Sequence, residues 1–154
     1  MRGVLISATA CGLLLCGCGP AGKVAETART AAGSGTGGSP CPIVSASDVS
    51  AAYGARVSET PANSLPQAQS CEFDGSGDTV VRLQVAPARY YEEHGGQGFH
   101  SLSGVGDKAS VSFELGGWRA IASQRDKIVV VTAQGPAAKE ENTIAVLKAA
   151  LAKL

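Results

Sequence analysis

The sequence predicts an α+β fold, in which a single antiparallel sheet packs against about three helices. Two stretches, 79–86 and 109–115, alternate apolar and polar residues, as expected of strands with one face in the core and one in water. The C-terminal segment 137–154 instead repeats apolar residues at helical spacing, namely Ile144, Leu147, Leu151 and Leu154. An apolar sheet face and an apolar helix stripe can bury each other, so these segments are expected to form one core.

The first half of the predicted domain contains one helix and three strands. A short helix is predicted over 46–53, because Ser45 can cap its N-terminus and Gly54 can end it. Three extended segments follow, at 55–59, 69–73 and 79–86. The turn-rich residues 74–78 predict a hairpin loop between the last two strands.

The second half is predicted to contain a helix, at least three strands and a final helix. Pro87 fits the first position of the helix, which would include Tyr90, Tyr91 and Glu93 and stop at the two glycines 95–96. Strands are predicted at 109–115, 118–123 and 127–133, the last two joined by residues 124–126. The apolar run 128–131 is typical of a central strand covered on both faces, and the helix over 137–154 is expected to cover it.

The N-terminal residues 1–17 are interpreted as an export signal. Arg2 provides one positive charge, and the following stretch 3–15 is free of charge but too short for the roughly 20 residues of a membrane-spanning helix. Leu15-Cys16-Gly17-Cys18 resembles the lipobox of bacterial lipoproteins, with Cys18 as the lipidated residue and Cys16 as the weaker rival. The alternative is an ordinary signal peptide whose cysteines are accidental.

Three regions are therefore expected: the signal peptide 1–17, the lipidated Cys18 with a disordered linker to residue 40, and a globular domain over 41–154. The linker is rich in glycine and small residues. Its residues 33–38 formally match GxGxxG, but no strand precedes them and no amphipathic helix follows, so no dinucleotide site is predicted.

Two of the five cysteines, Cys41 and Cys71, remain after the signal and the lipidated residue are set aside. Export places them in an oxidising compartment, so we expect them to form a disulfide bond. The alternative is a redox pair or a metal site. Neither cysteine belongs to a CxxC motif and no histidine is suitably spaced, which disfavours that alternative.

The composition excludes one class of partner and offers little catalytic chemistry. Thirteen basic residues balance thirteen acidic ones, so no net field would hold a nucleic acid. No serine stands in GxSxG, and the only histidines are His94 and His100. These could surround a metal together with Glu92 and Glu93, but the spacing matches no zinc motif. No metal and no cofactor are therefore predicted.

Two further groups of residues have both a functional and a structural interpretation. Four aromatic residues could line a pocket for an apolar or sugar-like ligand, although core packing is the more common role: Tyr90, Tyr91, Phe99 and Trp118. Residues 139–141, Lys-Glu-Glu, are interpreted as the solvated first turn of the last helix and not as a pair of catalytic carboxylates.

The order of these motifs resembles small envelope lipoproteins of actinobacteria that contain domains of unknown function. The resemblance rests on the lipobox, the linker and four short motifs: Pro40-Cys41, Ser47-Asp48-Val49, Ser70-Cys71-Glu72-Phe73 and Gly104-Val105-Gly106-Asp107-Lys108-Ala109. It extends over most of residues 40–152. It implies an exported α+β domain with a cysteine pair at matching places, and it implies no particular activity.

Two functions from different classes follow as expectations. The first is a non-enzymatic binding or interaction module, held on the extracytoplasmic face of the cell membrane by lipid on Cys18, with a small-molecule or protein partner in the envelope. The alternative is a hydrolase-like envelope enzyme, whose site would be assembled from distant residues with His94 or His100 as the base.

Overall fold

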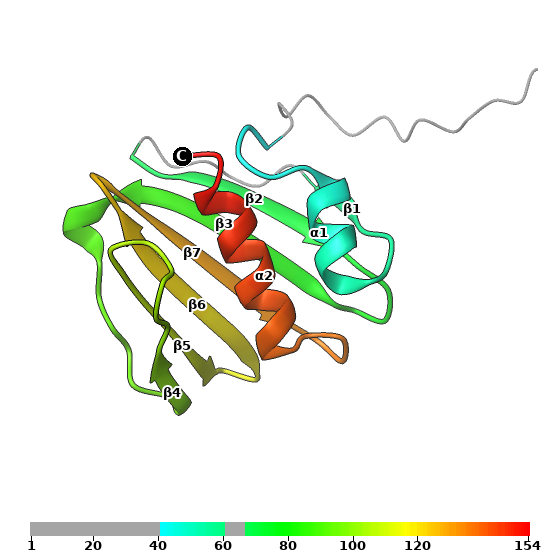
Figure 1. The fold of residues 1–154 in the computed structure, drawn as a ribbon. Coiled ribbons are helices and arrows are strands. Elements are labelled where there is room, and N and C mark those ends of the chain that lie inside the picture. The colour runs from blue at the N-terminus through cyan, green and yellow to red at the C-terminus, as the bar shows by residue number, and fades with distance from the viewer. Residues whose placement is uncertain (1–40, 61–66) are drawn as a thin grey trace, which may run out of the picture. The chain divides into compact units, whose positions relative to one another are not determined.

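Seven antiparallel strands form one sheet in the computed structural model, which describes residues 41–60 and 67–154 (Figure 1). The strands are β1 (Ser58–Thr60), β2 (Gln69–Asp74), β3 (Val80–Pro87), β4 (Gln97–Ser101), β5 (Lys108–Glu114), β6 (Gly117–Gln124) and β7 (Lys127–Gln134). Their order across the sheet is β1-β2-β3-β7-β6-β5-β4. After β3 the chain crosses to the far edge and returns through three hairpins, so that β7 pairs with β3 at the centre.

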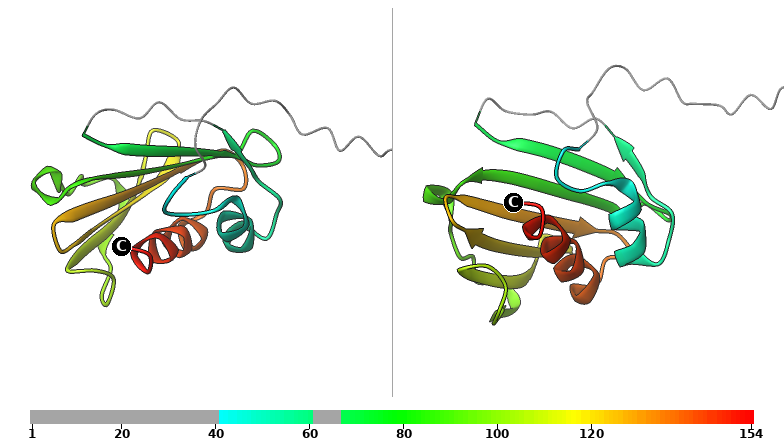
Figure 2. Two further views of the ribbon diagram at one scale, coloured as in Figure 1. Left: turned by 90° about the horizontal axis from the view of Figure 1, so that it is seen from above. Right: turned by 45° about the horizontal axis from the view of Figure 1, so that its top comes forward.

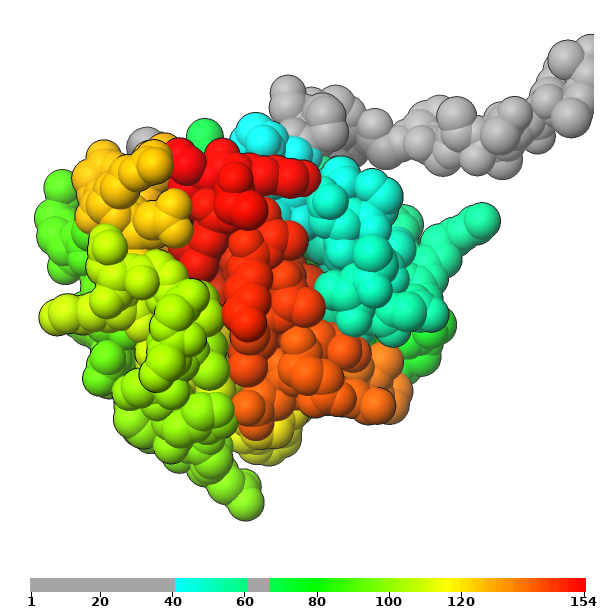
Figure 3. Space-filling view, in the orientation of Figure 1, coloured from blue at the N-terminus to red at the C-terminus, as the bar shows by residue number. Residues whose placement is uncertain are grey.

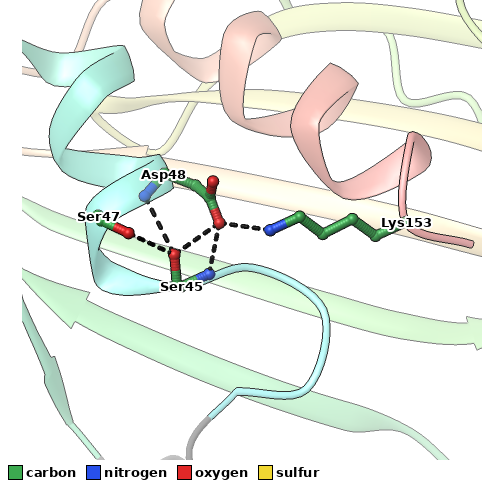
Figure 4. A network of polar contacts seen from close by, with 4 residues as sticks. All are labelled: Ser45, Ser47, Asp48 and Lys153. Atoms are coloured by element: carbon green, nitrogen blue, oxygen red, sulfur yellow. Dashed lines mark hydrogen bonds and ion pairs between the residues drawn. The ribbon is translucent and has the colours of Figure 1, made fainter.

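Two α-helices, α1 (Ala46–Tyr53) and α2 (Glu140–Leu151), lie on the same face of the sheet (Figure 2). Ser45 and Asp48 cap α1 reciprocally, and Gly54 ends it with a φ of 62°, which glycine adopts without strain. The α1 helix lies beside α2, and Lys153 after α2 donates a hydrogen bond to the Asp48 carboxylate across 2.5 Å (Figure 4). This contact joins the two helices at one end.

The main core lies between the helices and the sheet. Strands β2, β3, β5, β6 and β7 contribute the alternate residues that face the helices. The α2 helix contributes Val146, Leu147 and Ala150, which are fully buried. Phe73, Leu83 and Val131 are fully buried as well. The disulfide between Cys41 and Cys71 ties the segment before α1 to β2, which confirms the predicted bond.

The opposite face of the sheet is only partly covered. Ile121 and Ile128 alternate with the core residues along β6 and β7, and both are buried although they lie outside the helix-side core. The connection 88–96 covers this half, because Gly96 lies against β5 and the ring of Tyr91 lies near Ser110 and Arg119. On β3, in contrast, Arg82 and Gln84 are exposed.

The structure confirms the predicted antiparallel α+β architecture. It also agrees with the prediction for the first helix, the 74–78 loop, the strands after residue 107 and the final helix. The number of about three helices is wrong. The segment after Pro87 forms only a 3-10 turn, η1 (Ala88–Tyr90), and Tyr91 is already extended with a ψ of 116°. The extended backbone at Tyr91 lets its partly buried ring lie near Ser110 and Arg119 of the sheet.

One strand was not predicted and one begins later than expected. The edge strand β4 has all five residues exposed, so no alternation marks it in the sequence. The strand predicted at 55–59 is β1, which spans Ser58–Thr60. The described residues do not include the predicted signal peptide 1–17, Cys18, or the linker with its GxGxxG match.

Candidate functional site

A hollow of about 410 Å³ opens at the C-terminal end of α2. Figure 3 shows the three segments that meet there: the last turn of α2 in red, the β6–β7 turn in amber and the β4–β5 connection in lime green. We call it the α2 hollow, and it is lined by Gly104, Val105, Gly106, Gln124, Arg125, Lys148, Leu151, Ala152 and Leu154. Its volume falls within the range of about 300 to 1,000 Å³ that is typical of small-molecule sites.

The β4–β5 connection reaches the hollow through a close approach to β6. A Cβ atom on Gly106 would lie 2.4 Å from the Ser123 carbonyl oxygen, so only glycine fits at this position. The next residue, Asp107, donates its backbone N–H to the same carbonyl oxygen at 2.7 Å. The Asp107 carboxylate in turn accepts the backbone N–H of Arg125 at 2.8 Å. These bonds hold the connection and the β6–β7 turn together.

Side chains of the β6–β7 turn satisfy carbonyl groups at the end of α2. Gln124 donates its side-chain amide to the Leu151 carbonyl oxygen at 3.3 Å, and the Arg125 guanidinium donates to the Leu154 oxygen at 3.1 Å. The Leu151 oxygen also accepts the backbone N–H of Leu154 at 3.2 Å. The turn is thereby fixed against α2 and forms one wall of the hollow.

Two basic side chains line the α2 hollow, and the Asp107 carboxylate lies beside one of them, 2.8 Å from the Arg125 backbone nitrogen. Arg125 and Lys148 are its two charged side chains, and no lining residue is acidic. The ion pairs found within the described residues involve other basic groups, namely Arg82, His94, His100 and Lys153. Arg125 has five N–H donors and uses one of them on Leu154, so several remain available to a ligand.

A second, smaller hollow of about 270 Å³ lies on the uncovered face of the sheet. It is lined by Val80, Arg82, Gln84, Leu115, Thr132 and Gln134, and we call it the sheet-face hollow. The Arg82 guanidinium donates to the Glu72 carboxylate at 2.5 Å, so its charge is already neutralised by a neighbouring strand. The volume is also below the range typical of ligand sites. The α2 hollow is therefore the stronger candidate.

The two histidines that were considered as catalytic or metal-binding residues each lie beside a different glutamate. His100 places Nε2 3.1 Å from Glu140 and Nδ1 2.9 Å from the Gly98 carbonyl oxygen. Both ring nitrogens therefore lie within hydrogen-bonding distance of an oxygen, one on Glu140 and one on Gly98. His94 lies 3.7 Å from Glu92 at the surface. Within residues 41–60 and 67–154, no three histidine, cysteine or acidic side chains gather as a metal site would require.

The four aromatic residues do not line a common pocket. Trp118 packs edge-on against Phe113 at 5.4 Å, on the side of the sheet that faces the helices. Tyr91 lies on the opposite side, where burial raises the pKa of its hydroxyl. Tyr90 lies beneath the Arg89 guanidinium at 4.8 Å and is half exposed, as is Phe99. The core-packing role fits Trp118 best.

The last helix begins where the sequence predicted its first turn, because Glu140 and Glu141 start α2 after the N-cap residue Lys139. The contact of Glu140 with His100 was not anticipated. The residues of the α2 hollow were also missed. Residues 124–126 were recognised as a turn and Gly104 to Asp107 as part of a motif, but no local pattern connects them to Lys148.

Comparison with models of known protein families, with curated proteins and with solved structures finds no match for this chain. Within the described residues, neither α-helix is long and apolar enough to cross a membrane. The function is therefore inferred from the sequence motifs and from the geometry of the α2 hollow.

Proposed function

We propose that this protein is a lipoprotein of the bacterial cell membrane that displays a non-enzymatic binding module on the extracytoplasmic side. Lipid on Cys18 would anchor the chain, and the linker to residue 40 would connect the anchor to the domain. Those residues lie outside the described part, so the proposal for the anchor rests on the lipobox. The proposal for binding rests on the α2 hollow.

The observation that supports binding is the combination of size and lining in the α2 hollow. Its polar groups are an amide, a guanidinium and an ammonium, together with backbone groups of Gly104 and Gly106. A guanidinium stays protonated in proteins and serves as a donor rather than a base. Leu154 is half-buried at the rim, whereas Val105 and Leu151 are buried in the core beneath the hollow. Such a lining can hold and orient a ligand, and it contains no pair of nucleophile and base.

The anchor is tested by expressing the full-length chain in a bacterial host and measuring the intact mass and the membrane partition. We expect a mature protein that begins at Cys18, carries acyl chains and sediments with membranes. Cys18→Ala is expected to lose the acyl mass and leave the membrane fraction. Cys16→Ala is the matched control, because it changes the rival cysteine and should leave both readouts unchanged. An unlipidated, soluble product from all three chains would contradict the anchor.

A further inference from the structure

We infer that the connection 91–96 is a lid on the face of the sheet opposite the helices, and that it opens while the strands beneath it stay folded. The lid joins η1 to the edge strand β4. The inference depends neither on the lipid anchor nor on the α2 hollow. Three observations support it: the few contacts that hold the lid, the polar residues beneath it and the surface that its opening uncovers.

The lid is held by contacts at its two ends. Its middle residues, 92–95, take part in no backbone hydrogen bond within the described part of the chain. The side chains of residues 92–94 are exposed. At one end the ring of Tyr91 is partly buried near Ser110, and at the other end Gly96 lies against the backbone of Phe113. Segments with so few buried contacts open more easily than the rest of a fold.

The strands beneath the lid do not need it for their own backbone bonds. Strand β5 is paired with β6 along its whole length, and β6 is paired with β7 in the same way. Ser110 and Ser112, on the lid side of β5, are each 2% exposed, and Ser112 donates to the Glu114 carboxylate of its own strand at 2.5 Å. Water can bind a serine hydroxyl, so uncovering these residues costs less than uncovering aliphatic side chains.

Opening of the lid would extend the exposed polar surface of this face towards β5. Thr132 on β7 is paired with Arg82 on β3, and both residues line the sheet-face hollow. On its other side Thr132 is paired with Arg119 on β6, which is in turn paired with Ser112 on β5. Residues paired across antiparallel strands lie on the same face, so these four form one row. The lid covers the end of this row at Ser112 and thereby limits how much of it is accessible.

The experiment measures alkylation of a single introduced cysteine by N-ethylmaleimide in the mature full-length protein, quantified on the peptide that contains the cysteine. Ser110→Cys places a thiol beneath the lid, and Val111→Cys places one on the helix side of the same strand, where the native residue is 1% exposed. We expect Ser110→Cys to react at a rate that low concentrations of urea leave unchanged, because only the lid has to open. Val111→Cys should react only through unfolding, at a rate that rises roughly tenfold per molar urea.

Gly96→Ala and Gly95→Ala form a matched pair that tests the movement of the lid. A Cβ atom on Gly96 would lie 2.8 Å from the Phe113 carbonyl oxygen, whereas a Cβ atom on Gly95 would meet nothing within 4 Å. Neither glycine has a positive φ, so alanine fits the backbone conformation at both positions. Gly96→Ala should therefore push the lid away from β5 and speed the alkylation of Ser110→Cys roughly tenfold, and Gly95→Ala should not speed it.

An equal dependence on urea at the two thiols would overturn the lid, because Ser110 would then become accessible only when the sheet unfolds. Equal alkylation rates in the two glycine variants would also overturn it. If Gly96→Ala does not fold, the comparison of Ser110→Cys with Val111→Cys still decides the question. An unlipidated chain allows the same test, because the reaction is measured at residue 110 or 111 alone.

Discussion

The two faces of the sheet are covered in different ways. On one face, α1 and α2 pack over a continuous layer of aliphatic side chains, and Leu83, Val131 and Leu147 are 0% exposed. On the other face, one irregular connection covers β5 and β6, while Arg82 and Gln84 on β3 remain in water. Stability should therefore reside mainly on the helix side, and the uncovered part of the opposite face, at Arg82 and Gln84, should tolerate substitution.

The two hollows differ in volume and in the structure that forms them. On the sheet surface, Arg82 lines the smaller hollow and already has a carboxylate partner on the next strand. The α2 hollow forms where a helix end, a hairpin turn and a loop meet. The hollow formed by these three irregular segments is larger in volume, about 410 Å³ against about 270 Å³ on the sheet face.

The difference in stability between the two faces is tested most directly by Leu147→Ala. Leu147 is fully buried between α2 and the sheet, and removing its side chain leaves a cavity. We expect the free energy of unfolding to fall by about 3 kcal/mol. The measurement is urea unfolding followed by circular dichroism.

Leu115→Ala is the matched control, because it makes the same chemical change at a residue that is 96% exposed beside the sheet-face hollow. Its effect on unfolding should stay within about 0.5 kcal/mol. Equal losses in the two variants would show that the helix face does not dominate the stability.

The sequence was informative about the helix side because burial there is periodic. Leu147 and Leu151 repeat at helical spacing, and Val81, Leu83 and Val85 repeat at strand spacing, so one core could be predicted from local patterns. The second face lacks such a pattern. Tyr91 covers the second face from an extended segment. The sequence after Pro87 instead predicted a helix that includes Tyr91.

The α2 hollow could not be predicted, because its residues are brought together only by tertiary contacts. Arg125 and Lys148 are separated by more than twenty positions in the sequence, and each looks like an ordinary surface residue in its own segment. The apolar run 128–131 predicted cover on both faces of β7. In the structure Ile128 is buried on this face and Val130 is half-buried.

The role of the connection can be measured separately with Tyr91→Ala. Its ring lies over the second face near Ser110 and is partly buried, so we expect a loss of about 2 kcal/mol, less than for a fully buried aromatic residue. Tyr90→Ala removes the neighbouring ring, which is 48% exposed, and should change stability by no more than about 0.5 kcal/mol. Urea unfolding of both variants provides the test. If Tyr90→Ala were the more damaging of the two, the assignment of Tyr91 as the cover of this face would be wrong.

The smallest expected effect concerns the ion pair between the two helices of the covered face, and it depends on pH. The hydrogen bond from Lys153, followed by those from Ser45, holds the pKa of Asp48 well below its usual range. A depressed pKa means that this stabilisation is present above about pH 4, where an unfolded aspartate is ionised, and is lost as the pH falls further. Because Lys153 is 45% exposed, Lys153→Met should cost less than about 1 kcal/mol at pH 7. We expect the difference from the wild type to narrow below about pH 4 in thermal unfolding curves, whereas Lys127→Met, at the exposed start of β7, should show no such trend. A constant difference across the acid range would mean that Lys153 acts through packing and not through the Asp48 carboxylate.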